Sequence, residues 1–256
     1  MATGALVQSL YGRNAVREAL RAGRRRFFRL LLAEGMRRDE GVEELERLAS
    51  ARGCPVEYRP RGTMAQVARS REHQGVVLEA GPYPYAELEE ILAAAQEAGR
   101  DALVLLLDRV QDPQNLGTLL RTAEAVGAQG VVLPEHEAAG VTPAVVRASA
   151  GACEHLAIAR VTNLARALAA LQKAGLWVVG LESDAQATLY TQIDWDRPLA
   201  LVVGSEGFGL RRLIRERCDI LARLPMRGQV SSLNAAVAGS VALYEILRYR
   251  DALGHR

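Results

Sequence analysis

The chain of 256 residues lacks most signatures of a metal-binding or membrane protein. Its three cysteines, Cys54, Cys153 and Cys218, are far apart without a Cys-x-x-Cys pair, and its four histidines are scattered. We therefore expect no metal and three reduced, mostly buried thiols. No run of 18 apolar residues predicts a membrane span, and the N-terminus has neither a basic nor a long apolar segment of a signal peptide. The expected location is the cytoplasm.

Lysine is almost absent: Lys173 is the only one, so nearly all the positive charge is arginine. Residues 1–80 hold 15 arginines against 10 acidic residues, whereas the remainder holds 17 basic and 20 acidic residues. Arginine offers a planar fork that suits phosphates and base edges. Genome composition or heat adaptation accounts for the general preference, so only local arginine clusters call for a separate explanation.

A proline-rich stretch, Gly81-Pro-Tyr-Pro-Tyr85, divides the chain because it favours an extended connector. We predict domains over residues 1–80 and 101–256, with a linker and a first helix over 81–100. The N-terminal part resembles a small α/β module, with Asn14 capping its first helix and Gly53 ending its second. Its other predicted elements are strands at 27–33, 55–58 and 75–79 and a short helix at 64–68.

From residue 86 onward, apolar strand-like runs alternate with helical patterns. Continuously apolar runs are typical of strands covered on both faces. The repeated order predicts an α/β fold with a mostly parallel sheet, whose ligands bind beyond the carboxyl ends of its strands. The predicted strands are 102–107, 130–133, 156–160, 177–181, 199–203 and 220–224, and the predicted helices are 87–98, 114–126, 143–150, 164–174, 210–217 and 232–249.

The first informative segment, Asn115-Leu-Gly-Thr-Leu-Leu-Arg121, lies on a helix just after a strand. Arg121 stands among apolar neighbours, so its charge is expected to face a specific partner. That partner is either a phosphate, which arginine can hold by two hydrogen bonds, or a structural ion pair with Glu124 or Asp108.

The second segment, Gly204-Ser-Glu-Gly-Phe-Gly209, follows an apolar strand. Its glycines let the backbone turn tightly and approach a ligand closely. The spacing differs from Gly-x-Gly-x-x-Gly, and Glu206 would repel the pyrophosphate of a dinucleotide. An uncharged or cationic ligand suits this loop better, and a plain tight turn is the alternative.

The third segment, Leu224-Pro-Met-Arg-Gly-Gln-Val-Ser-Ser-Leu-Asn234, ends where a long helix starts. Ser231 or Ser232 can cap that helix, and Ser232 or Asn234 can donate hydrogen bonds into a pocket. No histidine or acid lies nearby in the sequence to activate Ser232, which argues against a hydrolase nucleophile.

In this order and spacing, the three segments resemble the motifs of the SpoU (TrmH-like) RNA ribose 2′-O-methyltransferases over residues 102–250. The stretches Leu10–Val16, His73–Val77 and Arg160–Arg166 are similar to the RlmB branch, which methylates a guanosine in the peptidyl-transferase region of large-subunit ribosomal RNA. The resemblance implies a SPOUT-type α/β fold with a C-terminal trefoil knot, a rare exception to unknotted chains. It also implies a homodimer, S-adenosylmethionine as cofactor and no metal.

The resemblance assigns roles to residues of all three segments. Those expected to hold the methyl donor are Gly204, Gly207, Leu224, Met226 and Leu233. The expected catalytic residues are Arg121, Asn115, Glu206, Ser232 and Asn234. Arg121 is the central one, as a base or as a ligand of the phosphate and the 2′-oxyanion, and Glu206 orients it or anchors the loops. Phe208 stands where close relatives often carry a glutamate, so we expect altered packing over the cofactor or altered specificity.

The N-terminal module is expected to dock ribosomal RNA. Its candidate contacts are Arg13, Arg24, Arg25, Arg26, Arg59 and Arg61; a solvated turn is the alternative for the arginine cluster. RNA is read largely by shape and exposed bases, so the target nucleotide does not follow from these residues. Three other functions compete: the same reaction on transfer RNA, RNA binding without catalysis, and an NAD-dependent oxidoreductase, which the glycine loop fits poorly.

Overall fold

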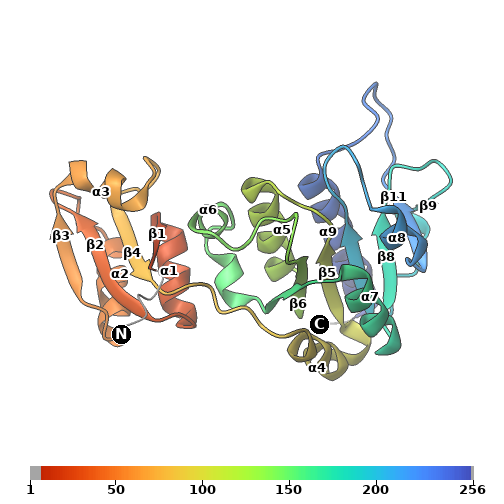
Figure 1. Ribbon diagram of the computed structural model, residues 1–256, viewed down its shortest axis with the longest axis horizontal. Helices are drawn as coiled ribbons and strands as arrows, with labels where there is room; N and C mark the ends of the chain where they lie inside the picture. The colour runs from red at the N-terminus through yellow and green to blue at the C-terminus, as the bar shows by residue number, and fades with distance from the viewer. Residues whose placement is uncertain (1–6, 255–256) are drawn as a thin grey trace. The chain divides into compact units, whose positions relative to one another are not determined.

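The computed structural model describes residues 7–254 in two compact units (Figure 1). The first six residues, which contribute to the expectation about a signal peptide, lie outside the described residues. Within the described residues, the first unit comprises residues 7–84 and Val141–His155, and the second comprises Tyr85–Gly140 and residues 156–254. The segment Val141–His155, placed by sequence in the second domain, thus belongs to the first unit.

The first unit is built on a four-stranded sheet in the order β1-β4-β2-β3. β4 pairs antiparallel with β1 and β2, whereas β2 and β3 are parallel. Leucines and valines such as Leu10, Leu30 and Val76 are fully buried in its core. The elements are β1 (Gln8–Tyr11), α1 (Arg13–Ala22), β2 (Phe27–Ala33), α2 (Glu40–Ala51), β3 (Val56–Arg59), α3 (Arg61–Ala68), β4 (Val76–Ala80), α6 (Pro143–Ala148) and the 3₁₀ turn η2 (Ala152–His155).

The expected cap of the first helix is wrong. Gly12, at φ 91°, is the N-cap of α1 without a side-chain hydrogen bond, and Asn14 lies inside the first turn. The side chain of Asn14 accepts a hydrogen bond from Arg17 at 3.0 Å instead. The N-cap is therefore a glycine, in a conformation that other residues avoid, and it lies two residues before the expected Asn14.

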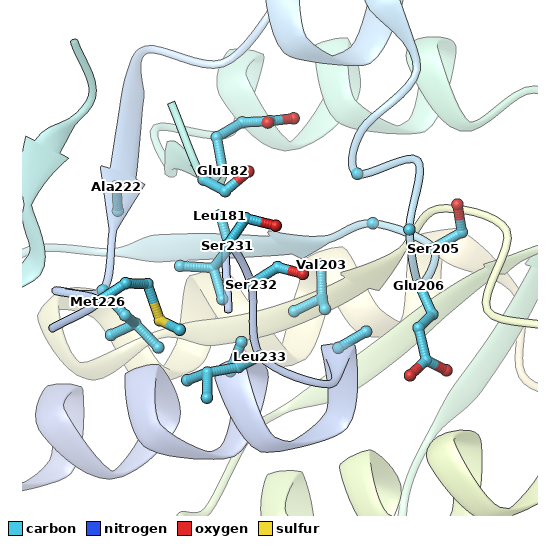
Figure 2. A pocket seen from close by; sticks show the side chains of 17 residues that line it. Leu181, Glu182, Val203, Ser205, Glu206, Ala222, Met226, Ser231, Ser232 and Leu233 are labelled. Atoms are coloured by element: carbon cyan, nitrogen blue, oxygen red, sulfur yellow. The ribbon is translucent and has the colours of Figure 1, made fainter. Parts of the chain in front are cut away.

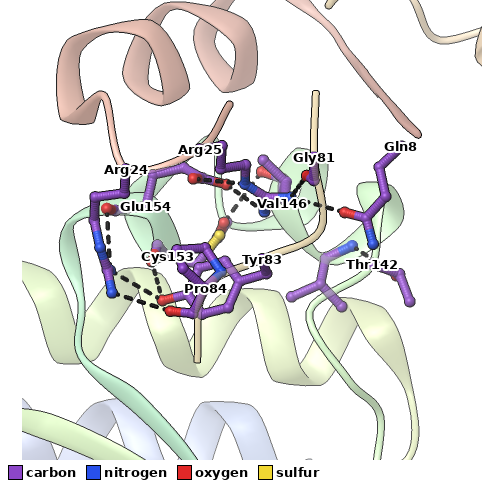
Figure 3. A network of polar contacts seen from close by, with 12 residues as sticks. Gln8, Arg24, Arg25, Gly81, Tyr83, Pro84, Thr142, Val146, Cys153 and Glu154 are labelled. Carbon is purple, nitrogen blue, oxygen red and sulfur yellow. Dashed lines mark hydrogen bonds and ion pairs between the residues drawn. The ribbon is translucent and has the colours of Figure 1, made fainter. Parts of the chain in front are cut away.

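A buried ion pair holds Val141–His155 within the first unit (Figure 3). Arg25 donates two hydrogen bonds to the carboxylate of Glu154, at 2.9 and 2.7 Å, and both side chains are 0% exposed. The same guanidinium donates to Gln8 and to the carbonyl of Gly81. Every charge in this network has hydrogen-bonding partners, as burial requires.

The second unit contains a seven-stranded sheet in the order β7-β6-β5-β10-β8-β11-β9, and all its strand pairings are parallel. The prediction of a mostly parallel sheet is confirmed. Its strands are β5 (Leu103–Leu107), β6 (Gly130–Pro134), β7 (Ile158–Val161), β8 (Trp177–Leu181), β9 (Thr188–Leu189), β10 (Leu199–Val203) and β11 (Ile220–Arg223).

Helices cover both faces of this sheet (Figure 1). One face forms an apolar core with α4 (Leu88–Ala98), α7 (Leu164–Lys173) and α8 (Arg212–Glu216). On the other face, α5 (Pro113–Ala125) packs against α9 (Ala235–Ala252). A side chain at Gly239 would come within 2.5 Å of Leu119, so the glycine allows the two helices to approach closely.

The serine cap expected for the last helix is also wrong. The N-cap of α9 is Asn234, whose Oδ1 accepts hydrogen bonds from the backbone N–H groups of Ala236 and Val237 at 2.9 and 3.1 Å. The helix therefore starts three residues after the predicted boundary, and Ser231 and Ser232 remain on the preceding loop.

Three further features concern the described residues, 7–254. Burial raises the pKa of the Cys153 and Cys218 thiols to about 12, which favours their protonated form. Within that range, no helix is long and apolar enough to cross a membrane, and no cluster of three or more histidine, cysteine or acidic side chains is placed to hold a metal ion.

Candidate active site

Three side chains from segments far apart in the sequence form a closed hydrogen-bonded ring. Asn115 donates from Nδ2 to Glu206 Oε2 at 3.1 Å. Asn234 donates from Nδ2 to Asn115 Oδ1 at 2.9 Å and to Glu206 Oε1 at 3.2 Å. One residue of each informative segment thus meets the other two, at the start of α5, after β10 and at the start of α9.

Helix capping fixes the orientation of this ring. The Oδ1 of Asn234 accepts the N–H groups that begin α9, so its Nδ2 must face the other way. Asp112 in turn caps α5 by accepting a hydrogen bond from the backbone N–H of Asn115 at 2.9 Å. Both oxygens of Glu206 accept amide N–H groups, as an ionised carboxylate does. Glu206 therefore anchors the loops; no hydrogen bond joins it to Arg121 within the described residues.

The glycine loop after β10 is closed by its own backbone. Ser205 and Gly209 exchange two backbone hydrogen bonds, at 3.1 and 3.0 Å. A side chain at Gly204 would lie 2.3 Å from the backbone of Gly209, and Gly207 and Gly209 have φ of 80° and 63°. The tight turn therefore requires glycines. Phe208, at its tip, is 93% exposed, so it does not pack over the pocket beside the loop.

A pocket opens beside this loop, at the carboxyl ends of β8, β10 and β11 (Figure 2). All five residues expected to hold the methyl donor line it, as do two of the expected catalytic residues, Glu206 and Ser232. The lining residues are Leu181, Glu182, Ser183, Val203, Gly204, Ser205, Glu206, Gly207, Gly209, Ala222, Leu224, Met226, Ser231, Ser232, Leu233, Ala235 and Ala238.

The chemistry of this lining fits S-adenosylmethionine. Apolar side chains such as Leu181, Val203 and Met226 suit the adenine ring, and the serine hydroxyls can bond its ribose. The two carboxylates, Glu182 and Glu206, favour a ligand that carries positive charge, as a sulfonium and an ammonium do. A pyrophosphate would be repelled by both, which argues against a dinucleotide.

Glu182 is a pocket residue that the motifs did not indicate. Its Oε1 accepts a hydrogen bond from the backbone N–H of Leu210 at 3.0 Å, and its carboxylate lies close to Gly209. It therefore supports the far end of the glycine loop from a different strand. A signal was present in the sequence, because Glu182 directly follows the predicted strand 177–181, where ligands of parallel sheets bind.

Arg121 lies apart from the ring. It is exposed on α5, six residues after Asn115, which is about 9 Å along a helix axis. It does not line the pocket. The ion pair considered with Asp108 is wrong, because that carboxylate binds Arg211 at 2.7 Å. Within residues 7–254, no ion pair joins Arg121 to Glu124 either, so its charge is available to an outside partner.

The arginine cluster of the first unit divides into three different environments. Arg25 is buried against Glu154, which contradicts its expected role in RNA contact. Arg24 donates hydrogen bonds to the Tyr83 hydroxyl and to the carbonyl of Glu154. Arg26 is exposed, with its guanidinium 5.3 Å from the ring centre of Phe28. Within this cluster, Arg24 and Arg26 remain candidates for RNA contact.

The other candidate RNA contacts lie at the surface. Arg13 pairs with Asp39 at 2.6 Å, and Arg59 pairs with Glu57 at 2.5 Å. Arg61 is exposed at the start of α3. Exposed ion pairs contribute little stability, so Arg13 and Arg59 can exchange their carboxylates for phosphates at low cost.

Comparison with solved structures defines the class of protein. An rRNA methyltransferase of Sinorhizobium meliloti with bound AdoMet superposes with a TM-score of 0.77 at 29% identity, covering 95% of this chain and 87% of that one. The SpoU methyltransferase AviRb of Streptomyces viridochromogenes, also with AdoMet, gives 0.78 at 27% identity, covering 96% and 91%. The protein is therefore a methyltransferase that uses S-adenosylmethionine, in agreement with the pocket's chemistry.

Sequence comparison identifies the family. The model of the SpoU rRNA Methylase family matches residues 102–244, and that of RNA 2′-O ribose methyltransferase substrate binding matches residues 9–86. The 23S rRNA (guanosine-2′-O-)-methyltransferase RlmB of Pseudomonas aeruginosa is 46% identical, over 96% of this chain and 98% of its own length. The chain belongs to the SpoU family of RNA 2′-O-ribose methyltransferases.

Proposed function

We propose that the protein methylates the ribose 2′-hydroxyl of a guanosine in the peptidyl-transferase region of large-subunit ribosomal RNA, in the cytoplasm. The observation that carries this proposal is the ring of Asn115, Glu206 and Asn234 beside a pocket that suits the methyl donor. The 46% identity to a guanosine methyltransferase over almost the whole chain supports the choice of nucleotide and RNA.

The pocket residues align the methyl donor with the ribose 2′-oxygen. S-adenosylmethionine would supply an electrophilic methyl group, and transfer needs the ribose oxygen in line with it. The bond from the 2′-oxygen to the methyl carbon forms as the sulfonium C–S bond breaks, and the 2′-hydroxyl proton is released to water. Gly204, Gly207, Leu224, Met226 and Leu233 hold the donor, while Glu206 keeps the glycine loop fixed through Asn115 and Asn234. Ser232, on the pocket wall, positions the ribose by a hydrogen bond. No metal takes part in this mechanism.

Arg121 acts on the acceptor side. To accept a proton, a guanidinium must first lose one of its own, and its very high pKa makes that loss unfavourable. We therefore assign it to the phosphate next to the target ribose and to the negative charge that develops on the 2′-oxygen. Its exposure and its lack of an ion pair among the described residues support this role.

We further propose a homodimer in which Arg121 of one subunit reaches the acceptor side of the active site of the other. The outer face of α9 carries an apolar stripe of Val237, Val241 and Tyr244, exposed by 48%, 40% and 53%. Their spacing of four and three residues places them on one side of the helix. Since α9 packs against α5, which carries Arg121, a second copy covering this stripe would bring its own α9 and α5 near the first pocket.

Subunit mixing tests this arrangement. Arg121→Ala and Gly204→Val each inactivate a homodimer under the proposal, because a side chain at Gly204 would lie 2.3 Å from the backbone of Gly209 and distort the donor pocket. An equal mixture, exchanged through partial denaturation, should recover about a quarter of the wild-type rate, because half the dimers are mixed and each holds one intact site. No recovery, despite mixed dimers detected by mass spectrometry, would place both residues of a site on one subunit.

The first unit is proposed to dock the ribosomal RNA through Arg13, Arg24, Arg26, Arg59 and Arg61. Its match to the RNA substrate-binding family and its exposed guanidinium groups support this role. Replacing Arg26, Arg59 and Arg61 together by alanine should weaken RNA binding. The slope of log affinity against log salt concentration should become about three less steep, about one for each lost phosphate contact. An unchanged slope would remove these residues from the RNA interface.

We also propose that Leu224–Asn234 threads the loop after β10 as a trefoil knot. Both segments line one pocket, which is consistent with an interlocked arrangement. Stretching single molecules by their two ends should leave a tightened knot, seen as an unfolded contour length shorter than that of 256 extended residues. A full-length contour would show an unknotted chain.

The decisive test of the function is a map of 2′-O-methyl groups. Ribosomal and transfer RNA from a deletion strain should lack methylation at one guanosine of the large-subunit RNA, and the purified protein should restore it. Loss at a transfer-RNA position alone would overturn the proposed substrate. Donor binding without methylation of any RNA would favour a non-catalytic RNA-binding role.

A further inference from the structure

A second cavity lies in the same unit, at the carboxyl ends of β6 and β7. Its lining combines buried apolar residues with more exposed polar residues. The apolar members include Pro134, Leu164 and Ile214, and the polar ones include His136, Thr162 and Arg211. Nucleobases bind where apolar side chains contact the ring and nearby polar groups bond its edge.

Arg211 is oriented by a buried carboxylate. Its Nε and its backbone N–H both donate to Asp108, at 2.7 and 2.9 Å, and the Asp108 side chain is 0% exposed. Within residues 7–254, the two terminal nitrogens of Arg211 make no hydrogen bond. The guanidinium is thus held at its Nε, whereas the four N–H groups of its two terminal nitrogens are available at the cavity.

The cavity and the donor pocket share one short loop. Gly209 lines the donor pocket, and Leu210 donates its backbone N–H to Glu182 on that pocket's wall. The next residue, Arg211, lines the second cavity. An RNA strand that brings a ribose to the methyl donor would therefore have other parts of the same strand close to Arg211.

We propose that this cavity binds a nucleobase of the substrate RNA and that Arg211 reads the acceptor pair O6 and N7 of a guanine. This subsite rests on the proposed RNA methyltransferase function. Two parallel donors match that acceptor pair. A phosphate fits worse, because half of the lining residues are apolar and Glu137, an acidic residue, also lines the cavity. Arg211 lies outside the three informative segments of the sequence.

The first test uses mononucleotides and the full chain with labelled methyl groups. Guanosine monophosphate should shift the resonances of Ile214 and Leu213, which line the cavity. Cytidine monophosphate and inorganic phosphate should leave them unchanged. Equal shifts with inorganic phosphate would make the cavity an anion site, and shifts confined to the donor pocket would remove it as a base subsite.

The second test uses Arg211→Lys, which keeps the positive charge beside Asp108 but removes the pair of parallel N–H donors of the guanidinium. The KM for unmodified large-subunit ribosomal RNA should rise about tenfold or more, while the Kd for S-adenosylmethionine stays the same. Thr162→Trp should have the same effect by filling the mouth of the cavity, with Arg211 intact. The matched control is Arg212→Lys, because the side chain of Arg212 is 91% exposed, pairs with Glu216 and does not line the cavity.

The outcomes separate the two proposals. Wild-type KM in both Arg211→Lys and Thr162→Trp would overturn the subsite and leave the methyltransferase function in place. If no RNA is methylated by the wild type, the proposed function falls. Guanosine-specific shifts at Ile214 that vanish in Arg211→Lys would then still support a guanine site.

Discussion

The two units each join distant segments through polar side chains, but they do so in opposite environments. In the first unit, Arg25 and Glu154 are fully buried and neutralise each other. In the second, Asn115, Glu206 and Asn234 meet at the edge of an accessible pocket. Because it is buried, the first network can only stabilise the fold. The second network lies beside a pocket that a ligand can enter, so it can contribute to a binding site. Residue type alone does not distinguish these roles.

The largest effect is expected from breaking the buried pair. Arg25→Met leaves the Glu154 carboxylate buried without its partner, which should lower the free energy of unfolding by about 3–5 kcal/mol. Urea unfolding measures this change. The double variant Arg25→Met, Glu154→Leu should recover most of the loss, and Arg26→Met, at an exposed position, serves as control. Equal stability of the two single variants would contradict a structural role for Arg25.

The next effect concerns the exposed arginine of α5. Arg121→Ala should slow methyl transfer by about 10²–10³-fold, because one group that stabilises the developing oxyanion is lost. Donor binding by calorimetry should not change, since Arg121 does not line the pocket. Lys173→Ala removes one exposed positive charge at the end of α7 and should leave the rate unchanged. A wild-type rate in Arg121→Ala would remove this residue from the mechanism.

A smaller effect is expected within the hydrogen-bonded ring. Glu206→Gln replaces an acceptor oxygen by an N–H donor, which then faces the amide of Asn115 or Asn234. The loop loses one hydrogen bond, so the affinity for S-adenosylmethionine should fall by about tenfold. Glu216→Gln, on the exposed side of α8, is the matched control. Calorimetric constants that agree between the two variants would show that the ring does not support the pocket.

The smallest effect is a dependence on pH in the first unit. Burial, with a further contribution from Arg61, lowers the pKa of His73. Its Nδ1 accepts a hydrogen bond from the Gly75 N–H at 3.0 Å, which requires the neutral ring. The unfolded chain therefore takes up a proton first, and stability falls as the pH drops below about 6.5.

The matching experiment compares His73→Asn with the wild type. Between pH 7.5 and 5.5, the variant should lose less unfolding free energy, by up to about 1 kcal/mol. Urea titrations at both pH values give the difference. An identical loss in both proteins would assign the acid sensitivity to other groups.

Periodicity in the sequence predicted the parallel sheet and the bounds of β2, β8 and β10 without error. The short strands β1 and β9 were missed because neither forms a distinct apolar run. The meeting of the three informative segments in space could be predicted, because each segment follows a strand of the parallel sheet. The burial of Arg25 could not be predicted in this way, since its partner lies 129 residues away in the sequence. Glu182 was overlooked because no motif includes it, although its place after β8 was informative.

The position of Asn234 has a consequence for synthesis of the chain. The parts of the first unit are complete once His155 has left the ribosome, whereas the donor pocket still awaits Leu233 and the start of α9. A polypeptide that terminates between those points would carry an intact RNA-docking unit without a working active site. Under the proposed docking role of the first unit, premature termination would yield a fragment that competes with the enzyme for its RNA.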